Sequence, residues 1–162
     1  MNLKELLLDH KQKFREKLIE AVAKKNTLTK EEVIDEHSDF IKEYISEKYR
    51  SVDEVIERII NSEKPILLNI RRDRSREDKC KLCEGNQANV DEITGKYGEN
   101  IEVIEVSEDK PEGGALYNII FHEEAKEKKL PLTAVINKGK ILKFWAGKSV
   151  EPSVYEIYLK RI

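Results

Sequence analysis

Hydrophobic residues recur every three to four positions through the first 60 residues, a spacing that predicts amphipathic helices. The first predicted helix covers residues 2–24. Thr29 with Glu32, and later Ser51 with Glu54, are capping-box patterns that mark helix starts. We therefore expect two more helices before residue 61, one beginning at each pair. His10 and His37 fall on the apolar faces of the first two, where a buried, hydrogen-bonded pair is expected if these helices form a hairpin.

The apolar runs become shorter after Pro65 and predict strands that alternate with helices. Lys138-Gly139, between the last two runs, is a hairpin signal. From residue 51 the expected order is helix, strand, helix, strand, helix, strand, strand, helix. This order predicts an α/β fold with one parallel strand pair, joined by a crossover, and one antiparallel hairpin. The strands are expected at residues 66–70, 101–106, 132–137 and 141–146, with helices after Cys83, Gly113 and Glu151.

Length and charge set the domain organisation and exclude several partners. With 162 residues the chain suits about one ordinary domain. We expect a helical extension at residues 1–50, packed on a domain at residues 51–162. Lys and Arg (30) nearly balance Asp and Glu (32), which gives no reason to expect nucleic acid or a polybasic membrane arm.

The distribution of apolar residues predicts a cytoplasmic protein. No apolar run approaches the roughly 18 residues that span a membrane, and charges interrupt any signal-like segment at the start. The scarcity of Gln and Met beside abundant Lys, Glu and Ile is typical of thermophile proteins.

The candidate chemistry is the segment Cys80-Lys81-Leu82-Cys83, which follows a predicted buried strand and opens a helix. Free backbone N–H groups and the helix dipole at that point favour a thiolate on Cys80, which would be the nucleophile. Cys83, one turn further on, can attack the resulting mixed disulfide and release the substrate. Two alternatives remain open. The pair could be half of a zinc or iron–sulfur site completed by other ligands, or two redox-silent cysteines.

The segment from Arg71 to Glu84 is rich in charge. It holds six basic and four acidic side chains, a net charge of +2. Positive charge near Cys80 favours its thiolate, so we expect Lys79 and Lys81 to lower the pKa of this thiol. The basic residues are Arg71, Arg72, Arg74, Arg76, Lys79 and Lys81.

From Ser51 to Arg161 the chain resembles the thioredoxin family. Cys80 to Val106 resembles the active-site helix and the following strand, and Leu130-Pro131 stands where thioredoxins carry a cis-proline. The resemblance implies a thioredoxin-like fold, a mixed central sheet flanked by helices, here with an N-terminal helical hairpin. It also implies that Pro131 is cis and shapes a substrate groove with Leu130. Cys80 would be the exposed nucleophile and Cys83 the buried resolving thiol.

The chain departs from the family pattern beside the cysteines. Lys79 replaces a tryptophan, and Lys81-Leu82 replaces Gly-Pro. Asn69 stands where thioredoxins bury an acid that relays a proton to the resolving thiol. Because an amide cannot take up that proton, a water or another carboxylate would have to do so.

These observations predict a thiol–disulfide oxidoreductase that acts on protein disulfides. No bound cofactor or metal is expected, because a reductase or a small thiol would supply the electrons. Residues 1–50 are a candidate homodimer surface. The alternative is a redox-silent or redox-sensing module that binds a protein partner. His122 is expected at the surface or facing a partner.

Overall fold

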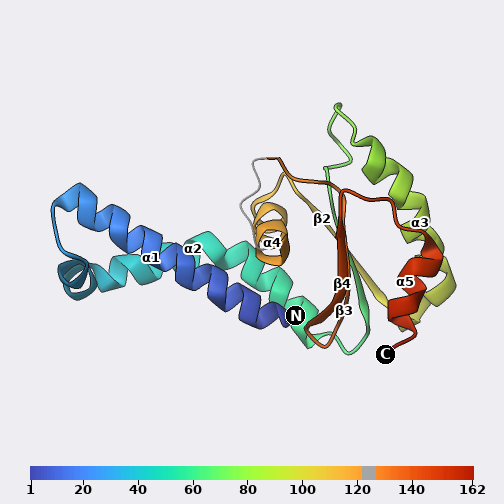
Figure 1. The fold of residues 1–162 in the computed structure, drawn as a ribbon, viewed down its shortest axis with the longest axis horizontal. Coiled ribbons are helices and arrows are strands. Elements are labelled where there is room, and N and C mark those ends of the chain that lie inside the picture. The colour runs from blue at the N-terminus through green and yellow to red at the C-terminus, as the bar shows by residue number, and fades with distance from the viewer. Residues whose placement is uncertain (122–126) are drawn as a thin grey trace.

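The computed structural model describes residues 1–121 and 127–162. His122 lies outside these residues. Within them, helices lie on both sides of a four-stranded sheet, and two long helices form a hairpin that extends away from it (Figure 1). The elements are α1 (Leu3–Asn26), α2 (Lys30–Asn61), β1 (Ile66–Arg71), α3 (Lys81–Tyr97), a 3-10 turn (Gly98–Asn100), β2 (Glu102–Ser107), α4 (Pro111–Phe121), β3 (Leu132–Asn137), β4 (Lys140–Ala146) and α5 (Pro152–Leu159).

The sheet is mixed, with strand order β2-β1-β3-β4. β1 pairs in parallel with β2 and antiparallel with β3, and β3 pairs antiparallel with β4. The turn between β3 and β4 contains Lys138 and Gly139, which both have positive φ, 50° and 78°. Tight hairpins favour such residues because their backbone twist matches that of the strands. The predicted parallel pair and antiparallel hairpin are confirmed.

β1 is the strand that organises the interior, since all six of its residues are buried. Ile66, Leu68 and Ile70 join a core with α1, α2 and α4. Leu67 joins a second core on the other face, with α3 and α5. Because side chains alternate along a strand, Asn69 and Arg71 also face α3.

The helical hairpin packs on the sheet through its inner half, which consists of the first turns of α1 and the last turns of α2. Leu3, Tyr49 and Ile56 belong to the same buried cluster as β1 and β3. Backbone pairing adds to this contact, because Leu3 N donates to Gly139 O at 2.8 Å and Ile141 N donates to Met1 O at 2.7 Å. The outer half has a small cluster of its own, formed by Ile19, Ala23, Val33 and Ile41.

The predicted helix start at Ser51 is wrong, because α2 (Lys30–Asn61) runs through this position. The Thr29 capping box is present, but the Ser51 pattern falls inside the helix. No Gly or Pro lies between residues 30 and 61 to break it. The irregularity is instead a kink at His37, with φ −123° and ψ 19°. α2 thus crosses the expected boundary at residues 50 and 51, and a separate domain at 51–162 stays a prediction.

Two further expectations also need correction. His10 does not pair with His37; its Nδ1 lies 2.6 Å from the Tyr49 hydroxyl, because the antiparallel helices place residue 10 opposite residue 49. The apolar spacing also predicts Val154, Ile157, Tyr158 and Ile162 as the buried face of the last helix. On α5 the buried residues are instead Tyr155 and Leu159, whereas Ile157 is 50% exposed. No helix among residues 1–121 and 127–162 is long and apolar enough to cross a membrane.

Candidate functional site

Cys80 and Cys83 form a disulfide at the start of α3, with their Cα atoms 5.2 Å apart. Cys80 is the N-cap residue, and its Sγ accepts a hydrogen bond from Cys83 N at 3.2 Å. In the reduced protein the same N–H and the positive end of the helix dipole would stabilise a Cys80 thiolate. Cys80 is partly exposed, while Cys83 is only 1% exposed. An incoming sulfur can therefore reach Cys80 more easily than Cys83.

The depth of Cys83 follows from the periodicity of α3. The helix buries Cys83, Asn86, Val90 and Ile93, which recur at intervals of three to four residues. The second cysteine is thus part of the face that packs on the sheet. Cys80 precedes the helix and stays at its rim.

The segment before β3 contains the predicted cis bond. The Leu130–Pro131 peptide bond is cis. Pro131 is buried and Leu130 is partly exposed, and Pro131 O accepts a hydrogen bond from Gly147 N at 2.9 Å. The substrate groove that the resemblance assigns to these two residues stays a prediction.

A buried polar chain connects α3 to β3, and nothing in the sequence pattern indicated it. Asn86 Nδ2 donates to the Tyr155 hydroxyl at 3.1 Å, and this hydroxyl donates to Thr133 Oγ1 at 3.0 Å. Asn86 Oδ1 accepts from Val150 N at 2.9 Å. Burial raises the pKa of Tyr155, which keeps its hydroxyl a neutral donor. This series of hydrogen bonds connects α3, the helix that carries Cys83, to β3, the strand that begins one residue after Pro131.

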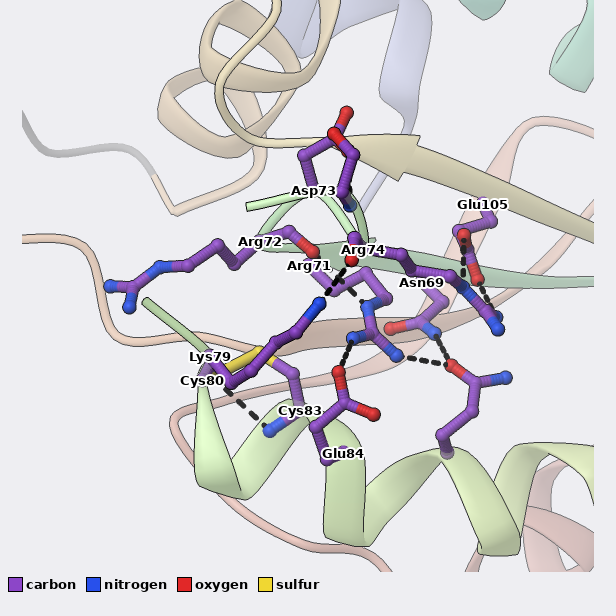
Figure 2. A network of polar contacts seen from close by, with 12 residues as sticks. Asn69, Arg71, Arg72, Asp73, Arg74, Lys79, Cys80, Cys83, Glu84 and Glu105 are labelled. Carbon is purple, nitrogen blue, oxygen red and sulfur yellow. Dashed lines mark hydrogen bonds and ion pairs between the residues drawn. A yellow bond between two sulfur atoms is a disulfide. The ribbon is translucent and has the colours of Figure 1, made fainter. Parts of the chain in front are cut away.

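A second polar cluster lies under the first turns of α3 and centres on Arg71, which is 2% exposed (Figure 2). Its guanidinium donates to Glu84 Oε1 at 2.6 Å and to Gln87 Oε1 at 2.9 Å. Asn69 Nδ2 also donates to Gln87 Oε1, at 3.3 Å. From the sequence, Arg71 counts as the first residue of the charged segment that follows the strand. The period-two alternation from Leu67 could have placed it on the α3 face instead.

Two arginines of the charged loop before Cys80 form ion pairs, partly with carboxylates from outside the loop. Arg74 pairs with Glu105 at 2.5 Å, and Arg76 bonds both Asp78 and Asp109. Glu105 and Asp109 lie outside the Arg71–Glu84 segment, so the net +2 counted from the sequence does not include them. The fold also brings Lys110 near Asp73 of the loop, so the count along the sequence does not by itself give the local charge.

The two lysines that were predicted to lower the pKa of Cys80, Lys79 and Lys81, have different surroundings. The Lys79 ammonium donates to the backbone carbonyl of Arg74, so it is engaged by the loop (Figure 2). Lys81 is exposed on the first turn of α3. Their influence on the Cys80 thiol stays a prediction.

Asp73 anchors the same loop to the turn after β2. Its carboxylate accepts from the Ser75 N–H and hydroxyl and from the Ser107 hydroxyl. These hydrogen bonds, led by the one from the Ser75 hydroxyl, lower the pKa of Asp73 to about 2. The hydrogen bond from Asp73 N is the main reason that the pKa of Asp109 is also lowered. The approach to Cys80 is therefore an ordered loop.

Among the described residues, no three His, Cys, Asp or Glu side chains gather as a metal ion would require. A metal held by Cys80 and Cys83 would need further ligands from elsewhere.

No protein-family model matches the chain, and no curated protein matches it. Two solved structures from the malaria parasite are similar to it. One is described as a malarial protein; it is 16% identical with a TM-score of 0.47, over 60% of this chain and 96% of that chain. The other is thioredoxin-2, described as a component of the parasite's protein secretion machinery. It is 18% identical, also with a TM-score of 0.47, over 61% of this chain and 84% of that chain.

The strand order and the position of the cysteines define the architecture. In the described part of the chain, a mixed four-stranded sheet lies between helices, and two helices are added at the N-terminus. A disulfide of Cys-X-X-Cys spacing opens the helix that follows the first strand, and a cis-proline precedes the third. The chain has a thioredoxin-like fold.

Proposed function

We propose that this protein is a thiol–disulfide oxidoreductase that exchanges its Cys80–Cys83 pair with disulfides or thiols of protein substrates. The observation that carries the proposal is the placement of the pair. The accessible Cys80 caps the helix and the buried Cys83 lies within disulfide-bonding distance. This arrangement separates an attacking sulfur from a resolving one.

The exchange conserves atoms and electrons without a bound cofactor. In the reducing direction the Cys80 thiolate attacks a substrate disulfide, and one substrate sulfur leaves as a thiolate. Cys83 then loses its proton and attacks Cys80 Sγ, which releases the second substrate thiolate. Two electrons pass to the substrate, and the Cys80–Cys83 disulfide remains. A separate reductase or a small thiol resets it, and oxidation of a substrate runs the same steps in reverse.

The surrounding residues have supporting parts in this proposal. Leu130 and Pro131 would line the groove that receives the substrate backbone. Lys79 and Lys81 would favour the Cys80 thiolate. A reducing, cytoplasmic location is consistent with a dithiol that needs continual reduction.

The test is a redox titration in graded thiol/disulfide buffers, with free thiols counted by alkylation and mass. We expect a reversible two-thiol transition. A midpoint near thioredoxin's roughly −270 mV would indicate a reductant, and a much higher midpoint an oxidant or isomerase. If no intramolecular disulfide forms in the folded protein, the proposal fails.

Two single-cysteine variants provide the matched control. Cys83→Ser should trap a covalent mixed disulfide with a model protein disulfide, because no resolving sulfur remains. Cys80→Ser should trap almost none, since Cys83 is buried. Equal trapping by both variants would contradict the assigned order of attack.

A protein-binding module is the second candidate, and the outer half of the hairpin favours it. Phe40 is 49% exposed and Tyr44 is 46% exposed on α2, and their rings lie next to each other, 5.9 Å between centroids. Contiguous exposed apolar surface is typical of interaction sites. The partner could be a second copy bound through residues 1–50, which sedimentation equilibrium would detect. A Cys80→Ser/Cys83→Ser variant that keeps full partner binding and cellular function would favour this candidate over the enzyme.

A further inference from the structure

Arg71 is a buried charged side chain that the proposed exchange does not use. Among the described residues, the other polar side chains that are fully buried (Asn69, Asn86 and Thr133) are neutral. A guanidinium keeps its charge in a protein, and burying it forfeits its hydration. Such a group has a large electrostatic influence on whatever lies beside it, because little water is present to screen it.

The hydrogen bonds of Arg71 place its guanidinium against the turn of α3 that carries Cys83. Its two terminal nitrogens bond Glu84 and Gln87, and Glu84 is the residue after Cys83. Cys83 and Gln87 are four residues apart, so they lie on one face of the helix. Helix side chains also lean toward the N-terminus, which directs Gln87 back toward that turn. Figure 2 shows the Arg71 guanidinium in contact with Glu84, the residue that follows Cys83.

The Arg71–Glu84 ion pair is asymmetric. The Arg71 side chain is 2% exposed, while that of Glu84 is 49% exposed. Water therefore screens the carboxylate much more than the guanidinium. The remaining partners of Arg71, Gln87 and the carbonyl of Arg72, are neutral. A buried neighbour would therefore feel the positive charge of Arg71 more than the negative charge of Glu84, and positive charge lowers the pKa of a thiol.

Several other charged groups around this turn are paired or exposed. On the strand side, Asn69 and Thr133 are neutral, and Tyr155 from α5 is kept neutral by burial. Beside the first turns of α3, Asp91 bonds Gln87 and Lys79 bonds the carbonyl of Arg74, while Lys81 is exposed. The loop carries the Arg72–Asp78 and Arg74–Glu105 pairs, and the far end of α3 carries Glu92 and the Lys96–Glu156 pair.

We propose that Arg71 is a positioning residue that stabilises the thiolate of Cys83, and that Glu84 moderates this effect. The inference rests on the proposed function, in which Cys83 must lose its proton before it can resolve the mixed disulfide. The Cys83 proton passes to water, and the thiolate attacks Cys80 Sγ. The bond between Cys80 and the substrate sulfur then breaks, and the substrate leaves as a thiolate. Arg71 accelerates this step by raising the fraction of Cys83 that is ionised at neutral pH.

The test measures the pKa of Cys83 in a Cys80→Ser background, where it is the remaining thiol. Thiolate absorbance and the pH dependence of alkylation provide two independent readouts. Arg71→Gln removes the cation and should lower the thiolate fraction at neutral pH about fivefold or more. Glu84→Gln removes the opposing carboxylate and should raise that fraction. Arg71→Lys keeps the charge and should restore most of the loss.

Opposite shifts from the two halves of one ion pair are the expected signature, because simple loss of structure would not move the pKa in two directions. Arg74→Gln is the matched control, since Arg74 also pairs with a glutamate but its side chain is 55% exposed. It should change the thiolate fraction less than about twofold. Shifts of the same sign from Arg71→Gln and Glu84→Gln, or a shift from Arg71→Gln no larger than the control, would overturn the proposal.

A kinetic measurement extends the test to the full dithiol protein. With Cys80 intact, Arg71→Gln should lengthen the lifetime of the mixed disulfide and move its pH profile toward alkaline pH. If Arg71→Gln does not fold, Glu84→Gln decides the matter, and an unchanged or raised Cys83 pKa in that variant overturns the proposal. The thiol pKa is read without substrate, so it is independent of whether the redox titration supports exchange.

Discussion

The two halves of the helical hairpin have the same secondary structure but very different surroundings. The inner half contributes Leu3, Leu7, Tyr49, Val52, Ile56 and Ile59 to the core that the sheet and α4 share. The outer half buries only Ile19, Ala23, Val33 and Ile41, and these pack against residues of α1, α2 and the turn between them. It also leaves Phe40 and Tyr44 open to solvent.

This difference shows that chain position is a poor guide to what belongs to the fold. The first turns of α1 are far from the strands in sequence, yet they belong to the inner half and cover one face of the sheet. Among the described residues, the buried cluster of the outer half comes from α1, α2 and the turn between them. Helical segments outside a larger core are only marginally stable in water. A cut at residues 50 and 51 would pass through the inner half.

The largest expected effect comes from deleting residues 1–50. The deletion strips Leu3, Leu7 and Tyr49 from the core and removes the backbone pairing of Met1 and Leu3 with the β3–β4 hairpin. We expect loss of cooperative folding and aggregation, seen by circular dichroism and size-exclusion chromatography. A folded, soluble remainder would show that the inner half is dispensable.

A trimmed hairpin is the matched control for this deletion. Replacing residues 17–42 with a short Gly-rich turn removes the outer cluster but keeps the contact between His10 and Tyr49. The trimmed protein should fold and should still form the Cys80–Cys83 disulfide. If the trimmed protein does not fold, the outer half is also required for folding, which would contradict the proposed difference between the two halves.

The next largest effect is expected from truncating a buried isoleucine in each half, Ile56 in the inner half and Ile41 in the outer half. Ile56→Ala opens a cavity in the shared core and should lower the free energy of unfolding by about 2–5 kcal/mol. Ile41→Ala should mainly loosen the outer half, so that its amides exchange faster while the global unfolding midpoint moves much less. Urea denaturation and native-state hydrogen exchange measure the two responses. Equal losses of global stability would mean that the hairpin is one cooperative unit with the sheet.

The smallest effect concerns Tyr49, which lies in the inner half. Burial, with the negative charge of Asp53 as a second cause, raises the pKa of Tyr49 to about 12 from its ordinary value of 10.0. The unfolded chain ionises first, so the stability due to this group is complete below pH 10 and is lost as the pH rises toward 12. Wild type should therefore lose up to about 2 kcal/mol more than Tyr49→Phe over that interval. Parallel stability curves for the two proteins would contradict the raised pKa.

The fold was largely predictable because its signals are local. Period-two and period-3.6 patterns placed the strands and most helices, and Lys138-Gly139 marked the hairpin. The continuity of α2 was missed because Ser51 with Glu54 has the composition of a helix start, and only packing of Val52 and Ile56 on the sheet decides that the helix runs through.

The site was predictable only where the chain itself brings residues together. Cys80 and Cys83 are one helical turn apart, so their pairing could be expected from spacing. Arg71 and Glu84 meet across 13 residues, and Arg74 and Glu105 across 31. Their partners depend on the register of the parallel strands and on the path of the charged loop, which a count of charges along the sequence cannot supply.

The projecting hairpin also determines how the molecule rotates in solution. The N–H bonds of an α-helix point nearly along its axis, and both α1 and α2 lie along the longest dimension of the molecule (Figure 1). Slow end-over-end tumbling reorients these bonds, whereas rotation about the long axis scarcely does. Nitrogen-15 relaxation should therefore report a longer correlation time for the hairpin amides than for N–H bonds that lie across that axis. An analysis that assumes a sphere would misread this anisotropy as slow exchange in α1 and α2.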